Sequence, residues 1–245
     1  QRKQRKKKTG STLLMAVLIA ILVLIALFLI INNVYVIRNV LIEGDVDLNT
    51  EEVVRLAGLS FGSSIRSVRE EQIRQNIEGT GEYILVGISI QRPNTVILAL
   101  ERRVPVAITF TGGKYLLLDK YGYVTRIYER TGDEVLPFIK GLNPTNYRLG
   151  RPVSVSEEQL SAYTELMRAL LEQRADTLIR ELDLTEVKSV TAESRIGVTV
   201  RFGDITAIDD KIVWMKAALM DLEERGDSVG ILDVSSGNQA QWRAS

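Results

Sequence analysis

One uninterrupted apolar run, Leu13 to Ile31, constrains this chain more than any other feature. As an α-helix, its nineteen residues rise about 1.5 Å each and extend about 28 Å, close to the thickness of the hydrocarbon core of a bilayer. The run therefore predicts one transmembrane helix, over residues 12–31. Six Lys or Arg precede it in residues 1–11, and asparagines follow it. Because basic residues stay on the cytoplasmic side, we expect a basic cytoplasmic tail over residues 1–11 and a C-terminus outside the cytoplasm.

A cleaved secretory signal peptide is the alternative interpretation of this run. Its apolar region would be shorter and would end in a small-x-small cleavage site, whereas Ile31-Asn32-Asn33-Val34 contains no such site. We therefore expect an uncleaved signal anchor, the arrangement of a single-pass type II membrane protein. Because the chain begins at Gln1, we also expect further residues to precede it.

Composition excludes several classes of enzyme. The chain has no cysteine and no histidine, so it has no thiol nucleophile, thiolate metal site, Ser-His-Asp triad or His-Glu-x-x-His zinc motif. The tail holds six of the 31 Lys and Arg, which leaves 25 basic and 31 acidic side chains, a net charge of −6, in the rest. This acidic body argues against a nucleic-acid partner. We expect no enzymatic activity, no cofactor and no metal.

Composition leaves open carboxylate pairs and a Ser-Lys arrangement, but no Ser in the chain is followed three residues later by Lys. Adjacent residues on a helix do not face each other, and four of five acidic doublets fall in the first turn of an expected helix, where the helix dipole stabilises negative charge. The doublets are Glu51-Glu52, Glu70-Glu71, Glu157-Glu158, Asp209-Asp210 and Glu223-Glu224. We interpret them as helix-start residues and not as catalytic groups.

Strand and helix patterns alternate after the apolar run. A short strand over residues 40–42 is followed by two helices that begin with capping boxes, a polar residue three positions before a Glu. These boxes are Asn49 with Glu52 and Ser67 with Glu70. The period then falls to two over residues 84–90 and 96–100, which predicts two strands joined by a turn at Arg92-Pro93-Asn94. The predicted order is strand, helix, helix, strand, strand.

This order resembles the polypeptide-transport-associated (POTRA) domain of the FtsQ/DivIB bacterial cell-division proteins. A V-x-I-x-G start at Val40, Ile42 and Gly44 carries the resemblance, together with a Glu-Arg-x-x-Pro-Val-Ala exit within Glu101–Ala107, where Val104 is an insertion. The resemblance implies an α+β fold: a transmembrane helix, a POTRA domain (β-α-α-β-β) over residues 36–105, and a β-rich domain with two packed helices over residues 106–235.

The second module is predicted to be rich in strands. Gly112-Gly113 marks a hairpin, and Asp119 with Gly122 fits a type I turn. In the family, corresponding segments have a D-x-x-G-x-V turn and an L-P-x-x-x-G segment. Here these are Asp119, Gly122 and Val124, and Leu136 to Gly141.

Two amphipathic helices are expected within this module. Ser156 caps the first, whose apolar stripe runs to Leu171, and the second spans residues 209–224, with Trp214 expected in the core. Three strands are expected between the helices, over residues 178–184, 187–192 and 196–202. Lys211 matches a lysine that follows a strand and a glycine in the family.

The resemblance places a protein-binding site near the C-terminus. In the family, the last strand of the β domain is an edge to which a segment of the FtsB/DivIC partner adds as a further strand. The partner-binding residues implied here are Val229, Ile231, Asp233, Ser235, Ser236, Gly237 and Trp242. The segment before them is two residues shorter than in FtsQ sequences, and residues 236–245 are expected to be a C-terminal tail.

The function implied is that of a non-enzymatic scaffold of the divisome in the plasma membrane at the division septum. The expected partners are FtsB/DivIC-like and FtsL-like single-pass proteins and, through them, the septal peptidoglycan synthase complex.

Two other functions remain open. A POTRA module also suits a polypeptide-handling component of a secretion or assembly system, although the sequence that follows has two amphipathic helices where an outer-membrane barrel would need about eight strands. A hydrolase of cell-wall glycans would rest on acidic residues alone.

Overall fold

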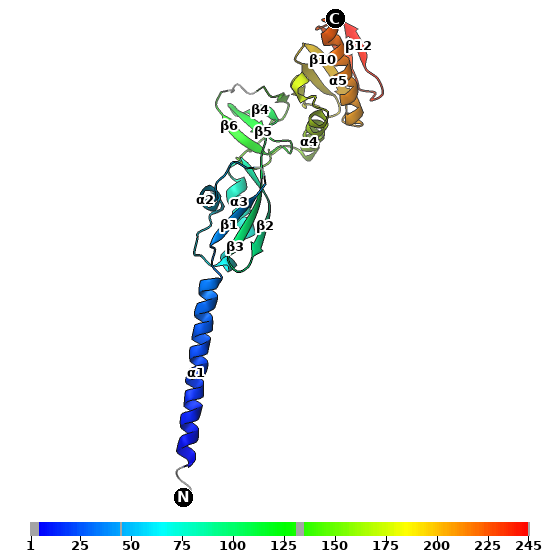
Figure 1. The fold of residues 1–245 in the computed structure, drawn as a ribbon. Coiled ribbons are helices and arrows are strands. Elements are labelled where there is room, and N and C mark those ends of the chain that lie inside the picture. The colour runs from blue at the N-terminus through cyan, green and yellow to red at the C-terminus, as the bar shows by residue number, and fades with distance from the viewer. Residues whose placement is uncertain (1–4, 45, 131–134, 245) are drawn as a thin grey trace. The chain divides into compact units, whose positions relative to one another are not determined.

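The computed structural model describes residues 5–44, 46–130 and 135–244, and their side chains except those of residues 5–12, 31 and 32. It is a mixed α+β protein with one long N-terminal helix and a sheet-rich body (Figure 1). The chain divides into two compact units: residues up to Ile77 together with Leu85–Glu101, and Glu78–Ile84 together with the residues from Arg102 onward.

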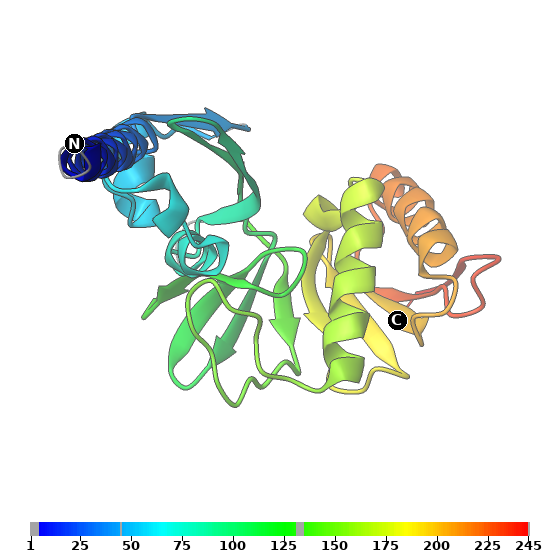
Figure 2. The ribbon, with the colours of Figure 1, turned by 90° about the horizontal axis from the view of Figure 1, so that it is seen from below.

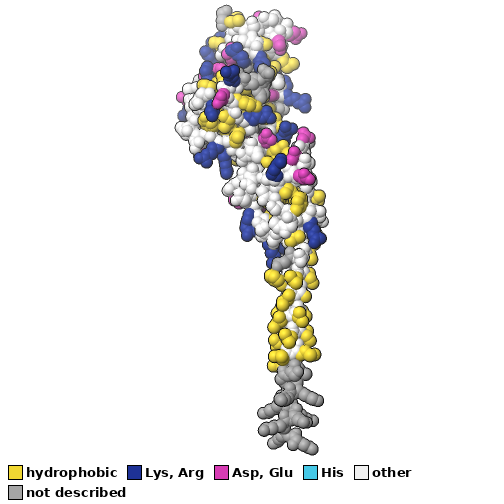
Figure 3. All heavy atoms as spheres, turned by 90° about the vertical axis from the view of Figure 1, so that its left-hand side faces the viewer, with side chains coloured by type: hydrophobic (Ala, Val, Ile, Leu, Met, Phe, Trp, Pro, Cys, Tyr) yellow, Lys and Arg dark blue, Asp and Glu magenta, His cyan; other side chains and the backbone are white. Residues whose placement is uncertain are grey.

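Helix α1 (Arg5–Val34) has 30 residues and an 18-residue apolar segment, Leu13–Ile30, that is long enough to cross a membrane. All side chains of that segment are exposed, and hydrophobic side chains cover its surface in Figure 3. The helix begins earlier than predicted, because residues 5–11 of the expected tail are helical. Residues 1–4 of that tail lie outside the described residues.

The first unit contains the predicted order of strand, helix, helix, strand, strand. Its elements after α1 are β1 (Asn39–Glu43), α2 (Thr50–Ala57), the 3₁₀-helix η1 (Ile65–Ser67), α3 (Glu70–Glu78), β2 (Tyr83–Gln91) and β3 (Thr95–Arg102). The sheet order is β1-β3-β2, with β1 parallel to β3. Buried aliphatic side chains from β3 and from both helices form its core: Val53, Ile73, Ile77, Val96, Leu98 and Leu100.

The two predicted capping boxes have different outcomes. Asn49 Oδ1 accepts from the Glu52 N–H at 2.9 Å, and the Glu52 carboxylate accepts from the Asn49 N–H at 3.1 Å, so the first box is confirmed. The second prediction is wrong, because Ser67 is the last residue of η1 and its hydroxyl donates to the Ser64 carbonyl at 2.7 Å. Helix α3 begins at Glu70.

The second unit is built on a nine-stranded sheet in the order β12-β11-β10-β9-β8-β7-β4-β5-β6. Its strands are β4 (Ala107–Thr111), β5 (Lys114–Leu118), β6 (Val124–Tyr128), β7 (Phe138–Lys140), β8 (Ile179–Asp183), β9 (Val190–Ser194), β10 (Val198–Gly203), β11 (Gly230–Asp233) and β12 (Gln241–Ala244). The helices are α4 (Glu157–Glu172), η2 (Asp176–Leu178) and α5 (Ile208–Arg225).

Helices α4 and α5 lie side by side and contribute their apolar faces to one core with the sheet (Figure 2). Ser156 caps α4 by accepting from the Gln159 N–H at 3.2 Å, as predicted. The Gly112-Gly113 hairpin is confirmed between β4 and β5, and the Gly122 N–H donates to the Asp119 carbonyl at 3.0 Å in the predicted turn. Both hairpin glycines have positive φ, the conformation that such a two-residue turn requires.

Three expectations in this unit differ from the structure. Trp214 is 43% exposed and lies outside the core, so its placement there was wrong. The middle of the three expected strands begins at Val190, three residues later than predicted. The expected tail over residues 236–245 contains strand β12, which pairs antiparallel with β11.

Candidate partner-binding edge

The seven residues implied by the family resemblance fall on β11, on the turn after it, and on β12. Ile231 and Asp233 are half-buried residues of β11, and Trp242 is a half-buried residue of β12. Ser235, Ser236 and Gly237 form the turn at one end of β11, whereas exposed Val229 precedes the other end. The seven residues therefore lie on β11, on its two flanks and on its neighbour β12. We call the part of the sheet formed by β11, the turn after it and β12 the corner.

Strand β11 is not an edge of the sheet. It pairs in parallel with β10, where Thr199 lies opposite Ile231, and antiparallel with β12, where Arg243 lies opposite Ile231. Its backbone is therefore used on both sides. The edge is β12, and in the described part of the chain no other strand pairs with it. We call residues 241–244 the β12 edge.

The turn after β11 is held by short-range hydrogen bonds. Asp233 Oδ1 accepts from the Ser235 N–H at 3.0 Å and from the Ser235 hydroxyl at 2.7 Å, and the Gly237 N–H donates to the Val234 carbonyl at 3.0 Å. These bonds from Ser235, with smaller contributions from nearby arginines, lower the pKa of Asp233 below its usual value. The carboxylate therefore stays ionised and holds the corner in shape.

The same turn packs on the start of α5. Gly237 has φ +74°, and a Cβ there would lie 3.5 Å from Ala207 Cβ. Beneath it, Lys211 is buried, and its Nζ donates to the Asp204 carbonyl at 2.8 Å and to Asp204 Oδ1 at 3.1 Å. Hydrogen bonds from Thr206 and then Lys211 lower the pKa of Asp204. Lys211 thus fixes the loop that supports the corner.

Trp242 lies across a glycine. It packs against the hydrophobic core of the unit, and a Cβ at Gly230 would collide with Trp242 Cη2 and with the Arg243 carbonyl and lie 2.8 Å from Trp242 Cζ2. Only a residue without a side chain leaves β12 this close to β11. Gly230 is therefore a positioning residue for the β12 edge, and it was not among the predicted site residues.

The outer surface of the corner is polar. Gln241, Arg243 and Ala244 are exposed on β12, and exposed Arg201 lies on β10 in register with Asp233. The two arginines both act on the Asp233 carboxylate through their charge. This surface presents positive charge beside the open backbone of β12.

Strand β12 has only a weak signal in the sequence. Its four residues, Gln-Trp-Arg-Ala, contain one large apolar side chain and no alternation over a useful length. The only available signals were Trp242 itself and Gly230, twelve residues earlier.

The acidic doublets lie as predicted at helix starts. Four of them occupy the first turns of α2, α3, α4 and α5. Among the described residues, no group of three or more metal-ligating side chains is placed to hold a metal ion.

A buried ion pair at the opposite end of the sheet was missed. Arg103 Nη1 donates to Asp119 Oδ2, with both side chains nearly inaccessible, and the guanidinium lies 4.2 Å from the Tyr123 ring centre. Asp119 Oδ1 accepts from the Tyr121 and Tyr123 N–H groups at 2.9 Å each. The Tyr163 hydroxyl donates to the Asp119 carbonyl at 2.8 Å. Within the second unit, one polar network thus joins the predicted turn to Arg103, which precedes β4.

Comparisons with known proteins agree with this picture. No family model matches the chain. It is 19% identical over 221 residues to the cell division protein DivIB of Clostridium tetani, which covers 89% of this chain and 82% of that protein. It is 30% identical over 87 residues to the cell division protein FtsQ of Rickettsia felis and 29% identical over 87 residues to that of Rickettsia bellii.

The FtsQ matches cover 36% of this chain and about a third, 33%, of the length of those relatives. Together with the DivIB match, the FtsQ matches support the resemblance of this chain to the FtsQ/DivIB family and a role in cell division. With one N-terminal apolar helix, the chain fits a single-pass membrane protein.

Proposed function

We propose that this protein is a non-enzymatic scaffold of the division machinery, anchored by α1 with its N-terminus in the cytoplasm and its body outside. In this proposal, residues 36–105 are a POTRA domain, and the β domain that begins at residue 106 extends through β12. The scaffold binds an FtsB/DivIC-like single-pass protein and, with an FtsL-like protein, positions the septal peptidoglycan synthase complex.

The observation that carries the proposal is the open β12 edge, at the corner where the resemblance places the partner. An edge strand presents unpaired N–H and C=O groups, and a partner segment can pair with them as a tenth strand. β12 has only four residues, so main-chain pairing supplies few hydrogen bonds. Side chains must contribute the remaining affinity.

Two kinds of side chain are available beside the edge. Trp242 offers a half-buried aromatic surface, the residue type most often dominant in binding energy. Arg201 and Arg243 favour acidic side chains on the partner, since complementary charge raises the association rate and fixes the register. We expect the bound segment to carry at least one Asp or Glu opposite Arg243.

The decisive experiment separates the β12 edge from the rest of the fold. The full chain in detergent is titrated with the FtsB/DivIC-like protein of the same organism, and Kd is measured for wild type and for Gly230→Val. The valine side chain would displace Trp242 and the Arg243 carbonyl, so we expect binding at least about tenfold weaker, equivalent to about 1.4 kcal/mol.

Gly226→Ala is the matched control. Gly226 also has positive φ, +77°, but apart from its chain neighbours and its own helix backbone no atom lies within 4 Å of its added Cβ, and it ends α5. We expect its Kd to equal that of wild type. If Gly230→Val is poorly folded, Arg243→Glu tests the same edge from the surface. Unchanged binding in both edge variants would exclude this interface.

Depletion of the protein in growing cells tests the role itself. A division scaffold predicts filaments or chains of unseparated cells, and normal septation would contradict the proposal. The names of the relatives favour division over secretion.

A further inference from the structure

Three segments of the first unit meet directly after α1. The Ile65 N–H donates to the Tyr35 carbonyl at 3.0 Å, the Ile37 N–H to the Ser63 carbonyl at 2.8 Å, and the Arg38 N–H to the Asn94 carbonyl at 2.9 Å. Residues 35–39, 60–66 and 90–94, which are far apart in the sequence, therefore form one surface. By covalent connection, this surface begins one residue after α1 ends at Val34.

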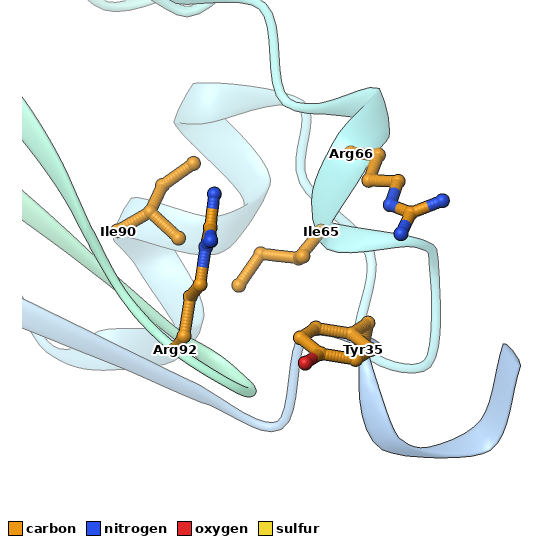
Figure 4. A pocket seen from close by; sticks show the side chains of 5 residues that line it. All are labelled: Tyr35, Ile65, Arg66, Ile90 and Arg92. Atoms are coloured by element: carbon orange, nitrogen blue, oxygen red, sulfur yellow. The ribbon is translucent and has the colours of Figure 1, made fainter. Parts of the chain in front are cut away.

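The surface contains a cavity of about 320 Å³. It is lined by Tyr35, Ile65, Arg66, Ile90 and Arg92. Figure 4 shows the side chains of Arg66 and Arg92 on either side of Ile65 and Tyr35. The Arg66 guanidinium lies 5.9 Å from the Tyr35 ring centre. We call these five residues the arginine pocket.

Positive charge gathers around the pocket without acidic residues. The segments 33–42, 59–69 and 83–100 contain Arg38, Arg66, Arg69 and Arg92 and no Asp or Glu. Arg38 and Arg69 donate to nearby carbonyls, whereas in the described part of the chain neither Arg66 nor Arg92 forms an ion pair. The chain beyond the tail has a net charge of −6, so this positively charged cluster lies in a part of the protein that is acidic on the whole.

The position of the pocket along the chain places it at the membrane surface. The apolar segment of α1 ends at Ile30 and the pocket begins at Tyr35, about 7 Å further at 1.5 Å per residue. The headgroup region adds about 5–8 Å to each side of the hydrocarbon core. Phe61 and Ile90 are large exposed apolar side chains on the same segments, and Tyr35 of the pocket is a residue type that is enriched at this interface.

We propose that the arginine pocket binds the phosphodiester headgroup of an anionic phospholipid in the leaflet where α1 ends. Arginine is suited to this ligand because its planar guanidinium donates two parallel hydrogen bonds to phosphate oxygens. The apolar walls formed by Ile65 and Ile90 accept the glycerol portion. The bound lipid ties the first unit to the membrane surface independently of any contact at the β12 edge.

Native mass spectrometry of the full chain in detergent tests this binding, with phosphatidylglycerol or phosphatidylcholine as the added lipid. For wild type we expect preferential retention of phosphatidylglycerol, and for Arg66→Gln/Arg92→Gln an apparent affinity at least about tenfold lower. The basic tail also attracts anionic lipid, but it is identical in both proteins and cancels in the comparison. Arg55→Gln, which removes a charge from α2 in the same unit, is expected to behave as wild type.

Three results would overturn the proposal. They are equal retention of the two lipids by wild type, unchanged retention in the double variant, and displacement of the lipid by millimolar inorganic phosphate, which would identify a site for a free anion. Arg66 and Arg92 are exposed, so we expect the double variant to unfold at the same urea concentration as wild type. Its binding to the FtsB/DivIC-like protein should be unchanged, which separates this result from the test of the β12 edge.

Discussion

The two edges of the nine-stranded sheet are treated differently. At β6, the Val124 N–H donates to the Arg151 carbonyl at 2.9 Å, and the Val124 carbonyl accepts from the Gly150 N–H at 2.8 Å. Gly81 lies against the same strand, where a Cβ would be 2.8 Å from the Thr125 carbonyl. At β12, the described part of the chain provides no such cover.

The β6 edge is covered by the chain's own loops, whereas the β12 edge is accessible. Open edges invite unwanted strand pairing, and folded proteins normally block them. The chain blocks β6 with its own loops and anchors the adjoining turn through the buried Arg103–Asp119 pair. The β12 edge is supported from behind, by Trp242 over Gly230, and stays accessible. We therefore expect changes near β6 to alter stability and changes at β12 to alter binding.

The largest effect is expected for Asp119→Ala. The change leaves the Arg103 guanidinium buried without its partner and removes the carboxylate oxygen that accepts from two backbone N–H groups, so we expect the free energy of unfolding to fall by about 3–5 kcal/mol. Urea denaturation measures this loss. Asp210→Ala, at an exposed position of α5, is the control, with a change below about 0.5 kcal/mol. Loss of partner binding by the folded Asp119→Ala protein would contradict the expectation that changes near β6 alter stability and not binding.

Trp242→Ala should lower both the stability of the protein and its affinity for the partner. The Trp242 side chain is only partly buried, so we expect a stability loss of about 1–2 kcal/mol, less than for a fully buried Trp, and binding weaker by at least about tenfold. Trp214→Ala is the matched control, because the second tryptophan of the chain is exposed on α5. It should change stability by less than about 0.5 kcal/mol. Equal behaviour of the two variants would remove the special role of the β12 edge.

Tyr163→Phe tests how the buried network near β6 makes stability depend on pH. Burial, assisted by the Asp119 charge, raises the pKa of Tyr163 well above 10.0. The folded protein therefore keeps this proton while the unfolded chain releases it, so stability is fully present below pH 10 and falls as the pH rises above it. We expect the phenylalanine variant to lose about 1 kcal/mol at pH 7. Its stability should decline less steeply than that of wild type between pH 9 and about 11.

Asp233→Asn should produce the smallest change, at the β12 corner. Because hydrogen bonds from Ser235 lower the pKa of Asp233 below 3.8, its contribution is present above that pH and disappears as the pH falls through the lowered value. We expect partner binding at pH 7 to weaken by no more than about threefold, as for exposed charges. The stability of the variant between pH 5 and 3 should be flatter than that of wild type.

Local features of the fold were predictable because their signals are local. The span of α1, the capping box at Asn49, the Gly112-Gly113 hairpin and both long helices follow from spacing along a few turns. Trp214 could also have been placed correctly. It is two residues, or about 200°, from buried Ile212 around the helix, and therefore on the opposite face.

The site was predictable only in outline. The resemblance indicated the corner, but β12 is too short and too polar to be recognised, and a tail was expected in its place. The Arg103–Asp119 pair and the arginine pocket join residues that are distant in the sequence, and no periodicity reports such contacts. Edge or interior position in a sheet is likewise decided by the neighbours of a strand. It cannot be read from the strand itself.

The parallel pairing of β11 with β10 has a consequence for the order in which the protein is made. These strands are joined by the crossover through α5, so the pairing of β11 with β10 closes a loop that contains the whole helix. β12 then closes onto β11 through a short connection, which costs little chain entropy. Among the described strands, β12 is also the last to be synthesised. If the proposed partner recognises β12, it therefore binds only chains whose sheet is complete.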